Sequence, residues 1–419
     1  MKSHVTVILL LIASLCAPRA VAQADSLARV DSIPHLSPRI PALAYLGVGA
    51  TALAVGTATH KIYPHRFSVT PRRERSDRAT DYLRYAPLAL PWVAKAAGVP
   101  TRSGWGRMAV SNAASFAIMG GAVRLTKNNV TSLRPDGSNI QSFPSGHAAL
   151  SFMGATITAH ELADVSPWYP MGAYALATAI AVERVLDRHH WPADVMAGAG
   201  IGIVSAELGY LIGDLVTGGR GLRDISGRDL RDNSNFSFLS LYAGLNLPVG
   251  RIRAANNIVQ RLPALSAGFH GAWAFDDHWG LGLELGLVST PLILEVEKIR
   301  TYVDNLSSLD FVVMPQYVCV LSNIFSLTAD VGVGYRKNFA IDADNDAVRA
   351  AFGTPVARCD VGCVIRLANR FSAKASVGYE LSHYKFSILP SESYCTNMAA
   401  TARGTASSLL FSISSRYEF

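Results

Sequence analysis

The stretch FSFLSLYAGLNL, residues 236–247, alternates between apolar and polar side chains with a period of two. Leu239, Leu241 and Leu245 share one face of this stretch, and Ser240 and Asn246 lie on the other. A period of two is that of a β-strand with one apolar face. The same alternation recurs to the end of the chain and predicts eight strands, at residues 236–247, 262–275, 279–291, 307–321, 324–336, 354–367, 370–386 and 405–419.

The last predicted strand places Leu409, Phe411, Ile413, Tyr417 and Phe419 on one side. It resembles the closing strand of outer-membrane β-barrels, for which eight is an allowed even number of strands. We therefore expect a C-terminal eight-stranded antiparallel β-barrel over residues 235–419, with a soluble sandwich or barrel as the alternative. Eight strands enclose an interior that side chains fill, so the barrel is expected to anchor the protein rather than to form a pore.

Upstream of the strands, apolar segments of helical length alternate with short polar loops. They are rich in Ala, Gly and Thr, and small residues let helices approach closely. The expected fold class is therefore multidomain, with an all-α bundle of about six helices over residues 40–217, a linker at 218–234 and then the barrel. The helices could pack within a membrane or on its surface. The six segments are 41–59, 83–99, 107–124, 147–163, 169–186 and 193–216.

The composition also favours a membrane setting, since only 16% of the 419 residues are charged, against roughly 25% in soluble proteins. The net charge of +7 is spread without a Lys/Arg-rich run, which argues against a nucleic-acid partner. A positive Lys2, an apolar stretch at 5–15 and small residues near 20–24 predict a cleaved signal peptide over residues 1–24. Four cysteines occur late in the chain, and no spacing names a disulfide or a zinc site: Cys319, Cys359, Cys363 and Cys395.

Three polar clusters stand at the ends of the helical segments. The first is Lys127 followed after six residues by Arg134-Pro135, and the second is the run Pro144-Ser145-Gly146-His147. The third is Arg184, then His190 after five residues and Asp194 after three more. In spacing and order these clusters resemble those of the type 2 phosphatidic acid phosphatase superfamily. The resemblance covers roughly residues 80–217, is highly specific as a set of three, and does not extend to the barrel.

The residue types suit phosphoryl transfer. The transition state spreads negative charge over three oxygens, and Lys127, Arg134 and Arg184 would supply fixed positive charge opposite them. Ser145 and Gly146 stand where a helix is expected to begin, so backbone N–H groups and the helix dipole can meet the anion there. No carboxylate cluster suited to a metal accompanies them, and we expect neither a metal nor another cofactor.

The resemblance implies a role for each residue. Neutral His190 would attack phosphorus and form a phosphohistidine, while Asp194, one helical turn away, would orient and stabilise its imidazole. His147 would protonate the departing alkoxide and then activate water. The neighbouring His189 is set aside because the spacing from Arg184 and to Asp194 selects His190. The family often has serine where this chain has Glu183, which could pair with Arg184 and affect the substrate range.

These features predict a metal-independent phosphatase that acts on a membrane lipid phosphate, with lipid A as the favoured substrate and undecaprenyl diphosphate or phosphatidylglycerophosphate as alternatives. A vanadium haloperoxidase, which shares the constellation, and a non-enzymatic outer-membrane barrel protein are the other hypotheses. An exported chain that crossed the inner membrane would place the site in the cytoplasm. We therefore favour the outer membrane of a Gram-negative envelope, with a periplasm-facing site, over the inner membrane. The sequence does not indicate an oligomeric state.

Overall fold

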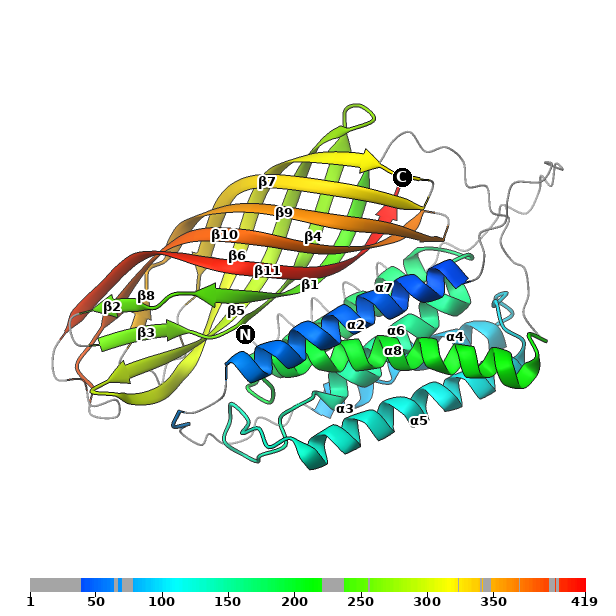
Figure 1. Ribbon diagram of the computed structural model, residues 1–419, viewed down its shortest axis with the longest axis horizontal. Helices are drawn as coiled ribbons and strands as arrows, with labels where there is room; N and C mark the ends of the chain where they lie inside the picture. The colour runs from blue at the N-terminus through cyan, green and yellow to red at the C-terminus, as the bar shows by residue number, and fades with distance from the viewer. Residues whose placement is uncertain are drawn as a thin grey trace.

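Two bodies lie side by side in the computed structural model, a bundle of helices and a closed ring of β-strands (Figure 1). The structure describes residues 39–63, 67–69, 78–220, 237–254, 257–322, 324–339, 341, 348–368, 370–391, 396 and 399–419. The predicted signal peptide and Cys395 lie outside these residues, as does most of the predicted linker. The helices run roughly along the length of the ring rather than capping one of its ends.

The described residues contain seven helices, one more than expected. The additional helix is α3, which is separated from α4 near Arg84 and Tyr85. Pro87 falls in the first turn of α4, where its missing N–H costs nothing, whereas in a helix interior it would break the hydrogen bonding. The helices are α2 (Arg39–Ile62), α3 (Arg78–Leu83), α4 (Ala86–Ala96), α5 (Trp105–Asn129), α6 (Gly146–Leu162), α7 (Trp168–Leu186) and α8 (Pro192–Thr217).

Helix α8 is the centre of the bundle, and its glycines explain how closely the other helices approach it. A Cβ on Gly200 would lie 2.4 Å from the backbone nitrogen of Leu53 in α2. A Cβ on Gly202 would lie 2.2 Å from the backbone oxygen of Ala149 in α6. The small residues seen in the sequence therefore serve close helix packing, as expected.

The ring contains eight long antiparallel strands in the order β5-β4-β1-β11-β10-β9-β7-β6, and pairing of β5 with β6 closes it. Each predicted strand corresponds to one of these. The strand β1 therefore pairs with both β4 and the final strand β11. The long strands are β1 (Phe238–Val249), β4 (Ala264–Ala274), β5 (Trp279–Val296), β6 (Ile299–Val320), β7 (Phe325–Asn338), β9 (Gly353–Ala368), β10 (Phe371–Ile388) and β11 (Ala400–Glu418).

Sequence reasoning missed three short strands and the full length of several long ones. The short strands are β2 (Ile252–Ala254), β3 (Asn257–Arg261) and β8 (Val348–Ala350). They extend the ring at the end where β6 and β11 begin earlier than expected. The reason is a change of pattern, which β5 shows: beyond its predicted end at residue 291, Leu292, Ile293 and Leu294 are buried one after another, so the alternation of buried and exposed residues is lost. A search for one apolar outward face stops at that change.

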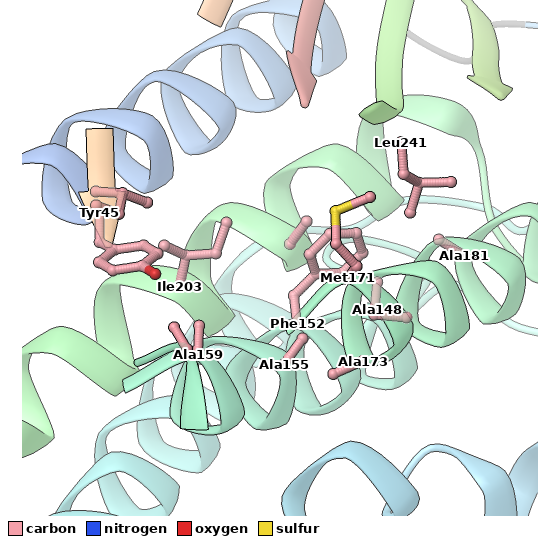
Figure 2. Close-up of a cluster of buried hydrophobic side chains, with 14 of the residues drawn as sticks. Tyr45, Ala148, Phe152, Ala155, Ala159, Met171, Ala173, Ala181, Ile203 and Leu241 are labelled. Atoms are coloured by element: carbon pink, nitrogen blue, oxygen red, sulfur yellow. The ribbon is translucent and has the colours of Figure 1, made fainter. Parts of the chain in front are cut away.

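The outer face of the ring packs on the helices through an apolar cluster. Leu241 of β1 belongs to the same buried cluster as Phe152 of α6, Met171 of α7 and Ile203 of α8 (Figure 2). Small side chains such as Ala155 fill the spaces between the larger ones. One continuous apolar core therefore joins the two bodies.

Candidate active site

The three sequence clusters come together at one end of the bundle. Lys127 lies in the last turn of α5, Ser145 caps the start of α6, and Arg184 lies in the last turn of α7, before the loop that carries His190. The backbone nitrogen of Ser145 donates to the backbone oxygen of Asp194 at 2.9 Å, which joins the second cluster to the third. The indole nitrogen of Trp191 donates to the backbone oxygen of Leu133 at 2.7 Å, which joins the third to the first.

His190 is fully buried beside Asp194, the pair selected from the sequence. Its Nδ1 lies 3.7 Å from Oδ2 of Asp194, longer than a hydrogen bond, as is common before a substrate binds. Burial is the main reason that the pKa of His190 is lowered to about 4, and the positive charges of Arg134 and Lys127 lower it further against the opposing charge of Asp194. The imidazole is therefore neutral at neutral pH, the state in which it has a lone pair.

Asp194 is itself held in place. Its Oδ2 accepts hydrogen bonds from the hydroxyl of Ser142 and from the backbone nitrogen of Trp191 at 3.0 Å. On the other side, Nδ1 of His60 in α2 lies 3.9 Å from Oδ1 of Asp194, and the His60 ring stacks on Phe143 at 4.3 Å between ring centroids. Sequence reasoning missed His60, which stands at the end of its own helix without any cluster nearby in the sequence.

His147 has two charged neighbours that the sequence did not single out. Its Nε2 lies 2.8 Å from Oδ1 of Asp81 and 3.0 Å from a terminal nitrogen of Arg84. The hydrogen bond from His147 is the main cause that lowers the pKa of Asp81. Burial and the nearby positive charge of Arg184 lower the pKa of His147 to about 3, so the imidazole of the free site is neutral and can accept from Arg84. A phosphate dianion beside Arg184 would favour the protonated form, which can donate to Asp81.

The site contains more hydrogen-bond donors than the protein itself uses. The Nε atoms of Arg84, Arg134 and Arg184 are buried and have no hydrogen-bond partner among the described residues. Lys127 donates to the backbone oxygen of Gln141 at 2.7 Å. Buried donors without partners are costly, so a convergent group of them indicates a place for an anion with several oxygens.

Two further residues beside the site, Glu183 and His189, have partners of their own. Glu183 does approach Arg184, with Oε2 3.8 Å from a terminal nitrogen of the guanidinium, and it also accepts from Thr80 at 3.3 Å. His189 is turned to Asp136, with Nδ1 3.3 Å from Oδ2. Two histidines in sequence thus pair with two different carboxylates, and of these two His190 faces Asp194. Within the described part of the chain, no group of three or more His, Cys, Asp or Glu side chains could hold a metal ion.

Comparison with known proteins shows what the helical domain is similar to. Residues 108–215, about a quarter of the chain, match the family model described as PAP2 superfamily. All eight residues singled out as the site lie within the matched range, whereas His60, Asp81 and Arg84 lie outside it.

A particular relative is also similar. The lipid A 1-phosphatase of Porphyromonas gingivalis is 44% identical over 112 residues, which are 27% of this chain and 25% of that protein. The match thus spans about a quarter of that relative's length. Among solved structures, the outer membrane protein OprG from Pseudomonas aeruginosa covers 44% of this chain and 95% of its own, with 16% identity and a TM-score of 0.38. A PAP2-type phosphatidylglycerolphosphate phosphatase from Bacillus subtilis covers 51% and 96%, with 15% identity and a TM-score of 0.21.

Proposed function

We propose that the chain is a metal-independent lipid phosphatase that works through a phosphohistidine on His190, with lipid A as its favoured substrate. The observation that carries the proposal is the neutral, buried His190 beside Asp194, facing a group of arginines whose Nε atoms lack partners among the described residues. The PAP2 superfamily match and the similarity to a lipid A 1-phosphatase support the reaction class and the substrate.

The reaction has two steps. In the first, Nε2 of His190, the ring nitrogen away from Asp194, attacks phosphorus while the bond from phosphorus to the lipid oxygen breaks. The departing alkoxide takes a proton from His147, and Asp194 stabilises the positive charge on His190. Lys127, Arg134 and Arg184 hold the three equatorial oxygens.

In the second step, His147 takes a proton from water, and the resulting hydroxide attacks phosphorus as the bond to His190 breaks. Inorganic phosphate leaves and His190 is neutral again. The arrangement around His147 suits this exchange because Asp81 can hold its protonated form and Arg84 its neutral form. The ring is proposed to be an outer-membrane β-barrel that anchors the phosphatase domain.

The proposal is tested by incubating the purified protein in detergent with lipid A and EDTA and measuring phosphate release. Wild type should release phosphate, and His190→Ala should not. The matched control is His189→Ala, which changes a neighbouring buried histidine paired with Asp136 and should keep most of the activity. Equal release by wild type and His190→Ala would refute the mechanism. Release only from undecaprenyl diphosphate or phosphatidylglycerophosphate would replace lipid A with one of those lipids.

A further inference from the structure

The outside of the ring carries a band suited to a membrane. On β7 the outward side chains Leu327, Val331 and Val333 are exposed and apolar, and they are bounded by Phe325 at one end and Tyr335 at the other. Aromatic residues typically border the apolar band of a membrane barrel. Ten residues of a strand tilted by about 40° rise about 25 Å, which is the usual height of that band.

The helical bundle lies at the same height as this band. It packs on the outer face of β1 and β11 through Leu241 and Ile413, and its helices run along the ring (Figure 1). Three of its helices, α2, α5 and α8, are long and apolar enough to cross a membrane. The outward surfaces of α2 and α5 expose apolar side chains such as Leu43, Phe116 and Leu125. A membrane that surrounds the ring therefore surrounds the helices too.

The two ends of the ring differ. At one end the long strands are joined by short turns, at residues 275–278, 321–324 and 369–370. At the other end the connections are 250–263, 339–352 and 389–399, and the fourth is the tip of the long β5–β6 hairpin. Membrane barrels of the outer-membrane type have short turns on the periplasmic side and longer loops on the cell exterior. The long-loop end is accordingly the exterior end.

The polarity of the strands supports this assignment. On β10 the outward residues Val377, Tyr379 and Leu381 are apolar, but the next two outward residues are His383 and Lys385. The ring therefore leaves the apolar layer at about Leu381 and projects beyond it at the long-loop end, where the short strands β2, β3 and β8 are added. No comparable projection occurs among the described residues at the short-turn end.

The active site lies at the long-loop end. The side-chain nitrogen of Asn305 in β6 donates to the backbone oxygen of Val185 at 2.9 Å, and Asp304 pairs with Arg188 in the loop that carries His190. Trp191 packs against Ile293 and Tyr302, which lie in the projecting parts of β5 and β6.

The opposite end of the bundle is fixed to the short-turn end. Trp168, which begins α7, lies 5.0 Å from Tyr417 of β11 between ring centroids. Tyr417 is close to the strand end that pairs with Phe371, beside the short turn 369–370. Helix α8 has 26 residues, so its length of about 39 Å is enough to cross the layer between the two ends.

From these contacts we propose that the helical domain is inserted beside the ring in one outer membrane, with its active site at the exterior face. The substrate is then a lipid phosphate in the outer leaflet. The sequence favoured a periplasm-facing site; the asymmetry of the ring favours the other side. This inference rests on the proposed function for the nature of the substrate, but the placement of the site rests only on the ring and its contacts.

Labelling of single introduced cysteines on intact cells tests the placement. Ser138→Cys lies in the exposed loop between α5 and α6 at the active-site end, and Val165→Cys is its matched control in the turn between α6 and α7 at the other end. A charged maleimide that does not cross membranes is added before and after the outer membrane is permeabilised. Wild type gives the background from the native cysteines, and a periplasmic protein with a reactive cysteine must stay unlabelled before permeabilisation.

The expected result is labelling of Ser138→Cys on intact cells and of Val165→Cys only after permeabilisation. Labelling of Ser138→Cys only after permeabilisation, or the reverse pattern, would overturn the proposal. Phosphate release in detergent is measured for both variants, because in micelles the substrate can reach the active site whichever side of the membrane it faces in the cell. Activity in detergent with the reverse labelling would refute the placement alone, and the expected labelling with a wild type that is inactive in detergent would refute the proposed function alone.

Discussion

The helical domain and the ring both bury charged side chains, but they arrange them differently. Inside the ring, Arg336 contacts Asp310 and Glu380, with nitrogen-to-oxygen distances of 2.7 and 2.9 Å. Arg358 contacts the same two carboxylates and Glu284 as well. At the active-site end of the bundle, by contrast, three arginines lie together, and each keeps an Nε atom that no described residue accepts from: Arg84, Arg134 and Arg184. In the ring, Arg300 and Arg416 also keep such an atom, but neither belongs to a comparable group, and Arg416 is stacked on Phe238.

This difference in pairing distinguishes charged side chains that stabilise the fold from charged side chains that are available to bind a ligand. A buried ion pair that is fully matched fills space and leaves little for a ligand to bind. A buried cation with hydrogen-bond donors that the protein does not use can bind an anion favourably. The closed lumen network therefore supports an anchoring ring, and the open cationic cluster supports phosphate binding by the helices.

The largest expected effect comes from Asp194→Asn, which keeps the shape of the side chain but removes its charge. We expect kcat to fall on the order of 10³- to 10⁴-fold, because the imidazolium-like state of His190 loses its partner. Asp136→Asn is the matched control, since Asp136 pairs with His189 in the same way. Steady-state phosphate release measures both. An equal loss of kcat in the two variants would contradict a special role for Asp194 in the reaction.

Breaking the ion pairs inside the ring should lower the free energy of unfolding and leave the phosphatase activity unchanged. Arg336→Ala leaves Asp310 and Glu380 without one of their partners, and removing one member of a buried ion pair costs about 3–5 kcal/mol. Arg251→Ala, at a half-exposed ion pair with Glu295, should change stability by less than about 1 kcal/mol. Urea unfolding in detergent measures the difference. A stable Arg336→Ala ring that had lost its phosphatase activity would reverse the division of roles.

Asp136 makes a pH-dependent contribution to the free energy of unfolding at the active-site end of the bundle. Burial alone would raise its pKa, but hydrogen bonds from His189 and Ser138 outweigh burial and lower it to about 2. Because the folded pKa lies below the unfolded value of 3.8, the stabilisation is fully present above about pH 4 and is lost as the pH falls toward 2. The contribution is about 2 kcal/mol.

The measurement is thermal inactivation between pH 2 and 5, with activity assayed after return to neutral pH. Wild type should lose stability across this range, and Asp136→Asn, which cannot titrate, should lose less. A parallel decline in both would assign the acid sensitivity to other groups, including the carboxylates of the ring.

The smallest predicted effect concerns Asp81, which the sequence did not indicate. Asp81→Asn removes the carboxylate that accepts from protonated His147, so kcat should fall about 10-fold and the basic limb of the pH profile should move to lower pH. Asp81→Glu should restore the limb in part. A uniform loss with an unchanged profile would mean that Asp81 only supports the fold.

Much of this arrangement follows from local pattern. The period of two predicted each long strand, and the resemblance of the three clusters to the type 2 phosphatidic acid phosphatase superfamily singled out His190 and Asp194. The projecting ends of the strands could not be found this way, since successive residues such as Leu292, Ile293 and Leu294 are all buried there and the period of two is lost. His60 and Asp81 reach the site only through tertiary packing, so no spacing in the chain predicts them.

Trapping of the covalent intermediate tests the central claim most directly. Wild type is mixed with lipid A that carries a radioactive phosphate, quenched in alkali within a single turnover, and digested to locate the label. The account predicts an acid-labile phosphohistidine on His190 that is absent from His190→Ala and present in His189→Ala. Phosphate release with no label on His190 at any time, or a label that persists in His190→Ala, would contradict it.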